Sequence, residues 1–308
     1  MKLKSQGKYD KKVRLPKYLD KDSYNVISFN QFKKKELKDG YVTFPKSKTL
    51  RFKVKNTNLH FINVVPKNDY VQVNFIYKKQ EKELKKDNGK YMGIDLGVDN
   101  LATCTSNVTQ SFIIDGKKVK HINQFYNKKI GEVKSELKKK NNKEKSHKTR
   151  QLTLKRNNKI DDYFHKASRY IINQAVSNDV RTIIVGHNKD WKQEVNIGKV
   201  NNQKFIQIPF DRLIHQLKYK GSLEGISVIE VEESYTSKCS FIDNETIEKH
   251  KTYVGSRTKR GLFQSSKSLI NADVNGSFNI MRKALKCNSD AVMPADAGFV
   301  YNPVKVYL

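Results

Sequence analysis

A single aspartate among glycines is the clearest candidate for chemistry in this chain. Asp95 lies in the apolar run that begins at Tyr91, between Gly93 and Gly97. A carboxylate in a buried strand is costly unless it binds something, because it loses its hydration. The flanking glycines let a ligand approach the backbone, and divalent metal ions with the phosphates they hold suit such an oxygen donor. Asp95 is therefore a candidate metal ligand, although the Gly-x-Asp-x-Gly pattern alone fits a structural turn equally well.

A second candidate carboxylate, Asp273, lies far along the chain in the segment NADVNGSFN that begins at Asn271. It falls in the first turn of an expected helix, where it could also act as a cap favoured by the helix dipole. Asn275 and Asn279 are four residues apart on that helix, so they share a face and could orient a water molecule or a phosphate.

Metal-dependent phosphodiester cleavage would require a third acidic group. The two-metal reaction needs several carboxylates that converge on cations about 3.5–4 Å apart, one ion activating water and the other stabilising the leaving oxygen. Asp95 and Asp273 supply two of these carboxylates, so another acidic residue, usually a Glu, must be found.

The charge balance points to a polyanionic partner. Sixty-one Lys and Arg residues stand against thirty-one Asp and Glu residues, which leaves a formal net charge of +30. Self-repulsion of that size weakens a compact fold unless a polyanion offsets it, and nucleic acid gains further from the release of counterions. Fifteen Tyr and fifteen Phe residues interleaved with the basic runs favour a nucleic-acid-binding surface over the alternative of a merely solvated basic surface.

Cysteine usage and hydropathy exclude several classes of protein. Cys104, Cys239 and Cys287 are odd in number and far apart, so we expect neither a disulfide framework nor a four-cysteine zinc site. No apolar run approaches the roughly 18–20 residues of a membrane span, and the N-terminal segment lacks the apolar core of a signal peptide. We therefore expect a cytoplasmic protein that does not bind membranes and that associates with the nucleoid when it binds DNA.

The order of expected elements predicts an α/β protein. Its segments are a β-rich domain with the spacing of a small barrel or sandwich (1–90), a mixed-sheet core (91–233), an irregular polar stretch (234–270), and a final helix with a C-terminal tail (271–308). Within the core, helical spacing over 117–178 predicts a hairpin that breaks near 141–146. A strand, a helix and a strand follow it, over 180–186, 209–220 and 225–233.

Two basic surfaces are candidates for contact with phosphates. In the hairpin the candidates are Lys138, Lys139, Lys140, Arg150, Lys155 and Arg156, and in the loop before the last helix they are Arg257, Lys259 and Arg260. His165 and Arg169 could position nucleic acid from a helix surface, or simply pack there. Trp191 and Tyr235 could stack on bases, with a core role as the alternative.

Four ordered motifs resemble the TnpB family of insertion-sequence nucleases and the related type V CRISPR nucleases. They are YMGIDLGVDNLAT, VRTIIVG, ESYTSKCS and NADVNGSFNI, within about residues 20–286. The resemblance implies an RNase H-like (RuvC) mixed sheet with an inserted basic helical hairpin, preceded by a small β-barrel-like wedge domain. It implies an RNA-guided DNA endonuclease that uses Mg²⁺, with Mn²⁺ as an alternative. Its implied partners are DNA, a guide RNA and a transposase encoded by the same element. By this similarity Asp95 corresponds to the family's first metal-binding Asp and Asp273 to its last.

The chain departs from the family pattern at the middle strand. The family has an acidic residue where this chain has Gly186, which cannot hold a metal. In the implied fold the next strand lies beside the middle one and parallel to it, and here it ends in Glu232 and Glu233. Ligands gather at the carboxyl ends of parallel strands, so one of these glutamates could reach the same ions from about one strand spacing away, roughly 5 Å. Alternation lets only one of the pair face the metals and leaves open which one. The alternative is an exposed acidic strand end.

Other departures bear on the site and on the extent of the chain. Glu194 is a less favoured donor, and His187 could contact the scissile phosphate. The family's zinc ribbon uses two Cys-x-x-Cys pairs, of which only Cys239 is kept, so 234–270 resembles a degenerate zinc ribbon in the target-strand loading region and we expect no zinc. The family's opening strand and helical recognition insertion are largely absent, which implies a truncated gene copy or a minimal form.

These features leave two classes of function open. In the leading hypothesis the chain is a transposon-associated RNA-guided DNA endonuclease in which Asp95, Asp273 and one of the two glutamates hold the metals. If the glycine at position 186 has abolished catalysis, the chain is instead a nuclease-dead RNA-guided DNA-binding protein or repressor, or a truncated transposase-accessory remnant.

Overall fold

The computed structural model describes residues 25–44, 47, 49–67, 70–188 and 207–308. The chain divides into two compact units, Met1–Lys79 and Gln80–Leu308. The sequence predictions for Trp191 and Glu194 lie outside the described residues. No helix in the described ranges combines the length and the apolar character needed to cross a membrane.

Short strands around an aromatic cluster build the first unit. One antiparallel sheet has the order β1-β4-β5, formed by β1 (Ile27–Phe29), β4 (Leu59–Pro66) and β5 (Val71–Tyr77). A second pairs β2 (Tyr41–Thr43) with β3 (Arg51–Lys53), and the short helix α2 (Lys34–Lys38) precedes β2 in sequence. Phe44 packs between Phe29 and Phe52, with ring centroids 5.1 and 5.0 Å apart. Because the described strands form two separate sheets, the β-barrel-like wedge stays a prediction.

The charged segment over residues 80–90 belongs to the second unit, so the division falls earlier than the predicted boundary at residue 90. The backbone N–H groups of Lys82 and Lys85 donate to the carbonyls of Ser222 and Gly225, each at 3.2 Å. The ammonium group of Lys82 also lies 2.6 Å from the carboxylate of Glu224. These contacts attach residues 80–90 to the end of the helix Phe210–Ser222, which lies far away in the sequence.

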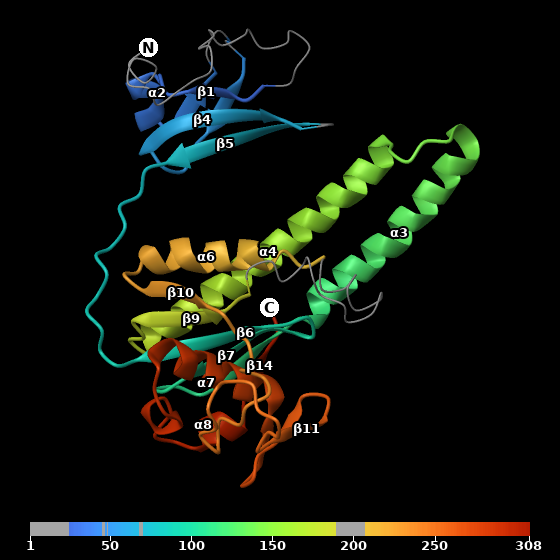
Figure 1. Cartoon of the computed structure of the whole chain (residues 1–308). Coiled ribbons are helices and arrows are strands. Elements are labelled where there is room, and N and C mark those ends of the chain that lie inside the picture. The colour runs from blue at the N-terminus through green and yellow to red at the C-terminus, as the bar shows by residue number, and fades with distance from the viewer. Residues whose placement is uncertain (1–24, 45–46, 48, 68–69, 189–206) are drawn as a thin grey trace, which may run out of the picture. The chain divides into compact units, whose positions relative to one another are not determined.

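A six-stranded mixed sheet forms the centre of the second unit (Figure 1). Its order is β10-β9-β6-β7-β8-β14, with β6 (Tyr91–Leu96), β7 (Asn100–Ser106), β8 (Phe112–Asp115), β9 (Thr182–Gly186), β10 (Ser227–Val231) and β14 (Val304–Val306). The first three strands in sequence form an antiparallel meander, whereas β9 runs parallel to β6 and β10 parallel to β9. The predicted mixed α/β sheet is confirmed, and the carboxyl ends of β6, β9 and β10 meet at one edge.

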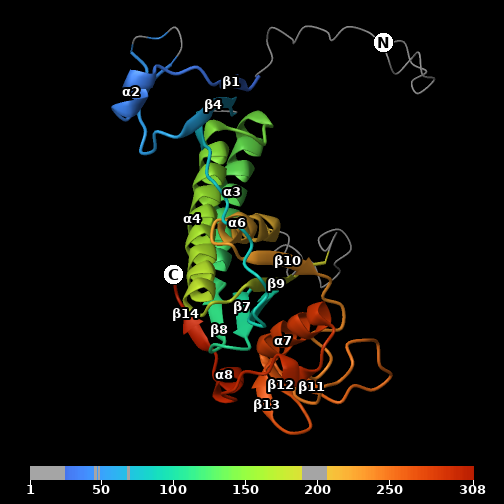
Figure 2. The same cartoon turned by 90° about the vertical axis from the view of Figure 1, so that its left-hand side faces the viewer.

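Helices cover both faces of this sheet. The helices α4 (His147–Ser177) and α6 (Phe210–Ser222) pack on one face, and α7 (Ala272–Leu285) packs on the other (Figures 1 and 2). Strand β9 shows the alternation that produces the two layers. Ile183 and Val185 belong to the core beneath α4 and α6, whereas Ile184 packs with Phe278 of α7.

The long basic segment is a helical hairpin, as predicted, formed by α3 (Lys117–Asn141) and α4. The first helix ends at Asn141, and its C-cap Asn142 adopts the left-handed conformation at φ 50°. The second begins with a capping box, in which the Ser146 hydroxyl accepts a hydrogen bond from the Thr149 N–H at 3.2 Å and the Thr149 hydroxyl accepts one from the Ser146 N–H at 2.9 Å. Local capping therefore fixes the break in the predicted place.

Residues 234–270 are more regular than the sequence predicted. The strands β11 (Ser256–Lys259), β12 (Leu262–Gln264) and β13 (Leu269–Asn271) form an antiparallel sheet. Its core is small, with Phe263 and Ile270 packed on Ala272, which is too few apolar residues to give a visible pattern in the sequence. The predicted tail likewise contains the 3-10 turn η1 (Ser289–Ala291) and the helix α8 (Gly298–Tyr301), and it returns to the central sheet as β14.

Gly93→Ala should destabilise the second unit. A Cβ atom at Gly93 would lie 2.5 Å from the carbonyl oxygen of Ser277 and 2.7 Å from Cγ of Met281, so α7 would have to move away from β6. We expect this overpacking to lower the free energy of unfolding by about 1–3 kcal/mol, measured by urea denaturation. The matched control is Gly131→Ala in α3, where a Cβ meets nothing within 4 Å and alanine favours the helix by up to about 1 kcal/mol. Equal effects of the two substitutions would contradict the close packing of α7 on β6.

Candidate functional site

Asp95 stands near the carboxyl end of β6, on the face covered by α7. Its neighbours Ile94 and Leu96 belong to the core on the opposite face, so alternation turns Asp95 toward α7. Gly276 of α7 allows this approach, because a Cβ there would lie only 3.1 Å from Oδ2 of Asp95. The carboxylate is thus held between sheet and helix, and part of its surface opens into a cavity.

Asp273 reaches the same cavity from the first turn of α7. The helix is capped by Asn271, whose side-chain oxygen accepts hydrogen bonds from the N–H groups of Asp273 and Val274 at 3.0 and 3.2 Å. The carboxylate of Asp273 is therefore not needed as the cap. It accepts a hydrogen bond from Nδ2 of Asn100 at 2.6 Å and lies 3.6 Å from the guanidinium of Arg257.

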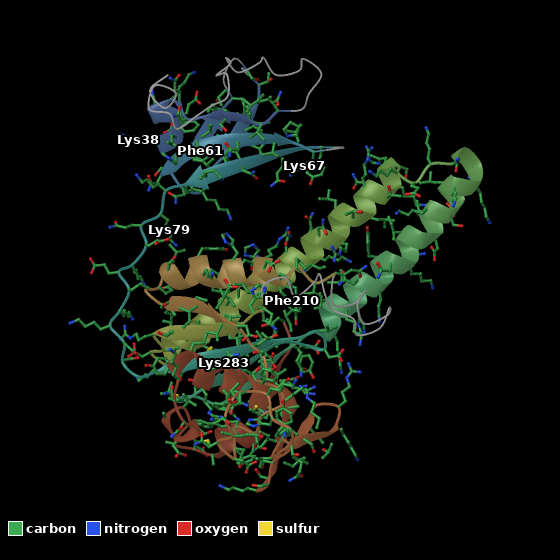
Figure 3. The ribbon with its side chains drawn as sticks, in the orientation of Figure 1. Lys38, Phe61, Lys67, Lys79, Phe210 and Lys283 are labelled. Carbon is green, nitrogen blue, oxygen red and sulfur yellow. The ribbon has the colours of Figure 1, made fainter. Side chains whose placement is uncertain are left out.

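The two glutamates that follow β10 have different surroundings. Glu232 is exposed and pairs at 2.5 Å with Lys283, which Figure 3 labels on α7. Glu233 lines the cavity, and its N–H donates to Oδ1 of Asn188 at 3.0 Å, while Nδ2 of Asn188 lies 3.5 Å from Oε1 of Glu233. Its other oxygen, Oε2, is buried and has no hydrogen-bond partner in the part of the chain that the structure describes.

Gly186 provides the space that Glu233 occupies. In the parallel pair β9–β10, Gly186 stands opposite Val231. A Cβ atom at Gly186 would lie 2.7 Å from Oε2 of Glu233 and 2.4 Å from Cδ1 of Ile280. The carboxylate of Glu233 therefore lies where a side chain at position 186 would begin. The absence of a side chain at Gly186 on β9 leaves room for the glutamate that follows β10.

Asp95, Glu233 and Asp273 line one cavity of about 380 Å³. Burial raises the pKa of Asp95 well above its usual range, the negative charges of Asp273 and Glu233 raise it further, and the positive charge of Arg257 opposes them. Burial also raises the pKa of Glu233 to about 7, with a contribution from Glu232 against the opposing charge of Lys283. These surroundings disfavour the charged carboxylates, so a bound cation would lower both pKa values.

The donors suit a hard divalent cation, which prefers carboxylate oxygens. The unpartnered Oε2 of Glu233 is an acceptor that such an ion would satisfy. Among the described residues no three His, Cys, Asp or Glu side chains are grouped closely enough to hold one ion by themselves. Any ions held in this cavity would therefore have to share the carboxylates, with water or substrate oxygens completing their coordination.

Asn275 and Asn279 do not have the predicted role. Both are fully buried, and their side-chain amides donate to the carbonyl of Cys239 at 2.9 and 2.8 Å. The prediction that they orient water or phosphate is wrong, because they instead anchor the loop whose preceding residues, 235–237, form part of the cavity wall.

Sequence reasoning missed Asn100 and Asn188, which contact the carboxylates of Asp273 and Glu233. An asparagine near a strand end is common in turns, so neither residue gave a distinctive signal. Tyr235 also lines the cavity, with its backbone in the left-handed region at φ 66°. That conformation is unusual for a bulky residue and marks the cavity wall as locally constrained.

The hairpin candidates for phosphate contact fall into two groups. The exposed ones are Lys138, Lys139, Lys140, Arg150 and Lys155. Arg156 is partly buried, donates to Oδ1 of Asn123 at 2.8 Å and to the carbonyl of Gln207, and lies 5.7 Å from the ring centroid of Tyr126. Its guanidinium therefore joins α3 to α4, and its contact with phosphate stays a prediction.

The remaining candidates lie around the edge of the sheet. Arg257 lines the cavity, Lys259 is exposed on β11, and Arg260 pairs with Asp99. His187 lies between two carboxylates, 2.6 Å from Glu230 and 3.2 Å from Asp211. Contact of His187 with a scissile phosphate stays a prediction.

Comparisons with known proteins agree with this architecture. Residues 74–192 match the OrfB family of IS605, described as a probable transposase, and residues 210–280 match the Cas12f1-like TNB domain. A TnpB-like protein of Methanocaldococcus jannaschii is 26% identical over 192 residues, covering 60% of this chain and 66% of that protein. A TnpB-like protein of Acidianus two-tailed virus is 24% identical over 217 residues, covering 68% and 45%.

Among solved structures, the chain resembles Cas12f1 from a cryo-EM complex with sgRNA and target DNA. The TM-score is 0.52 at 21% identity, over 72% of this chain and 45% of that one, which shows a shared fold. The two family matches place the chain in the class of the OrfB proteins of IS605. The chain belongs to the TnpB family. Its matched parts span 66% and 45% of the lengths of the two TnpB-like relatives.

Glu233→Gln should change how the stability of the metal-free protein depends on pH. The pKa of Glu233 is about 7 in the folded chain against an ordinary value of 4.5, so the unfolded chain releases this proton first as the pH rises. Protonated Glu233 is compatible with its buried site, so its contribution to the stability of the folded chain is fully present below pH 4.5. That contribution is lost as the pH rises through 7 and the carboxyl group ionises. Between pH 5 and pH 8 the wild type loses about 2.5 kcal/mol of stability through this group.

The measurement is chemical denaturation in EDTA at pH 5 and pH 8. Glu233→Gln should be more stable than the wild type at pH 8 and should lose most of that advantage at pH 5. Glu232→Gln is the control and should change the pH dependence much less, because Glu232 is exposed, is paired with Lys283 and adds only the smaller part of a pKa shift that burial of Glu233 mainly causes. A Glu233→Gln advantage that does not change with pH would contradict the burial of this group.

Proposed function

We propose that this chain is the nuclease core of a transposon-associated, RNA-guided DNA endonuclease that uses Mg²⁺, or Mn²⁺ in its place, to cleave phosphodiester bonds. The observation that carries the proposal is the unpartnered, buried carboxylate of Glu233, which fills the space left by Gly186 beside the cavity of Asp95 and Asp273. Membership of the TnpB family and the fold shared with Cas12f1 support this class of activity.

The finer fold assignment is an RNase H-like (RuvC) sheet. It is supported by an antiparallel meander of β6, β7 and β8 that is extended on the β6 side by two parallel strands. The net charge of +30 supports nucleic-acid partners. DNA and a guide RNA are proposed because the Cas12f1 structure contains both kinds of molecule. A transposase of the same element stays a prediction.

In this proposal Asp95, Glu233 and Asp273 hold the ions. When bound, a pair of such ions activates water and stabilises the leaving oxygen. Asn188 accepts a hydrogen bond from the Glu233 backbone N–H and donates to its carboxylate, and Asn100 donates to the carboxylate of Asp273. These amides keep the carboxylates oriented while the cavity is empty of substrate, as outer-sphere partners do in metal sites.

Positive charge at the cavity rim comes from Arg257, 3.6 Å from Asp273 and half exposed. A phosphate oxygen entering the cavity would therefore meet a guanidinium group beside the carboxylates, and Tyr235 offers an aromatic surface on the same wall. The exposed lysines of the α3–α4 hairpin would contact the backbone of the duplex without reading its sequence. Guide pairing would then supply the choice of target.

Cleavage of matched DNA by the purified protein–RNA complex tests the proposal. Asp95→Asn and Glu233→Gln should lower the cleavage rate in Mg²⁺ by more than the about 10–100-fold typical of outer-sphere residues, and Asn188→Leu should fall within that range. Glu232→Gln is the matched control and should cleave at a rate near that of the wild type.

Three results would contradict parts of this account. A wild-type complex that binds matched DNA but leaves it intact in both Mg²⁺ and Mn²⁺ would indicate an RNA-guided DNA-binding protein without nuclease activity. Cleavage lost in Glu232→Gln but kept in Glu233→Gln would assign the third carboxylate to the other glutamate. DNA binding lost in Asp95→Asn would place this residue in binding instead of catalysis.

A further inference from the structure

A second cavity is lined mainly by residues of α4 and α6. These two helices cover the face of the sheet opposite α7 (Figure 1). The volume of the cavity is about 630 Å³. Basic side chains and two aromatic rings line it, contributed by His165, Lys166, Arg169, Lys220, Tyr170 and Tyr219. The carboxylate cavity contains none of these residues, so the two cavities are separate features of the second unit.

Lys220 places a buried cation at this cavity, and none of the residues that the structure describes gives it a carboxylate partner. The residue is 4% exposed, and its ammonium group donates to the Ser168 hydroxyl at 2.6 Å and the His165 carbonyl at 2.9 Å, both neutral acceptors. Burial and, to a smaller extent, the positive charge of Arg169 together lower the pKa of Lys220 to about 8. A buried charge with no opposite charge beside it is costly, because hydrogen bonds to neutral groups replace only part of its hydration.

Arg169 adds a second cation at the exposed mouth of the cavity. Asp162 is the single acidic side chain among the residues that line the cavity, and it pairs with Lys166 at 2.8 Å. Leu308 also lines the cavity, and its main-chain oxygen accepts a hydrogen bond from Lys118. The charges of Arg169 and Lys220 are thus left facing one cavity, where they repel each other. An anion between them would reverse the sign of this interaction and would complete the coordination of both groups.

Aromatic surface lies next to these cations. Tyr219 is 37% exposed, and its ring centroid lies 6.0 Å from Nζ of Lys220. Tyr170 is half-buried and packs its edge against Phe112 at 5.5 Å. A phosphate-sized anion with a flat group attached would match both parts of the cavity, and a nucleotide has this combination.

We propose that this cavity binds one nucleotide of a single-stranded nucleic acid, with its phosphate at Arg169 and Lys220 and its base against Tyr219. The proposal rests on the proposed function only in taking nucleic acid as the ligand. Binding here needs no metal ion and no cleavage, so the two proposals can fail separately. The net charge of +30 favours a strand over a neutral ligand.

Photocrosslinking in EDTA tests the site in the presence of the other basic surfaces. The probe is a single-stranded oligonucleotide that carries 4-thiothymidine, bound to the full chain. We expect crosslinked peptides that contain Tyr219 or Tyr170. Arg169→Gln should reduce these crosslinks and weaken oligonucleotide binding by about tenfold, as expected for one lost charge-assisted hydrogen bond.

Lys218→Gln is the matched control for Arg169→Gln. It removes one positive charge from α6, but Lys218 pairs with Glu230 at 2.5 Å and does not line the cavity. Equal losses of affinity in the two variants, or crosslinks confined to other peptides, would overturn the proposal. Thymidine monophosphate that competes as well as the oligonucleotide would also overturn it, because the cavity would then be a site for free nucleotides.

Lys220→Met separates ligand binding from a purely structural role of the amine. If the buried charge is kept for a ligand, this variant should bind the oligonucleotide about tenfold more weakly and should be at least as stable as the wild type without ligand. A variant that unfolds more easily and keeps its affinity would show that the hydrogen bonds of Lys220 serve the fold alone.

Discussion

Holding several acidic side chains together inside one partly closed cavity is the constraint on which the second unit depends. Asp95 and Glu233 lose hydration there, and their charges repel each other and that of Asp273. Natural folds keep such unfavourable groups mainly where they serve a function. The surrounding structure supports them at specific points: Gly276 lets α7 approach Asp95, and the side-chain amides of Asn100 and Asn188 donate to the carboxylates of Asp273 and Glu233.

The carboxylate of Glu233 can enter the cavity because the space beside Gly186 is free of a side chain. The end of β9 has no side chain at Gly186, and Ile280 of α7 lies too close to admit one without rearrangement. The neighbouring parallel strand reaches the same edge, so a residue just past its end can enter the same space. The same sheet can therefore present a carboxylate at this edge from either of two neighbouring parallel strands, provided that the residue on the other strand is small.

Much of this architecture could be predicted from the sequence because its signals are local. Strand and helix periodicity gave the mixed sheet and the α3–α4 hairpin, and burial of a lone carboxylate among glycines singled out Asp95. The choice between Glu232 and Glu233 could not be made, since it depends on the contacts with Lys283 and Asn188.

The errors have the same origin in tertiary packing. The helical face shared by Asn275 and Asn279 was recognised, but nothing local shows that a loop packs onto that face and takes up both amides. The strands β11 to β13 and β14 were missed because each has only three or four residues, too short for an alternating pattern. The cavity beside Lys220 depends on the packing of α6 on α4, which the spacing of residues along either helix does not specify.

The most direct test of the central claim is to locate manganese by anomalous diffraction from crystals of the protein soaked in Mn²⁺. The account predicts metal peaks in the cavity within about 2–2.5 Å of carboxylate oxygens. Those oxygens should include Oε2 of Glu233 and belong otherwise to Asp95 and Asp273. Peaks at Glu232, or a cavity without metal in which Oε2 of Glu233 is still unpartnered, would contradict it.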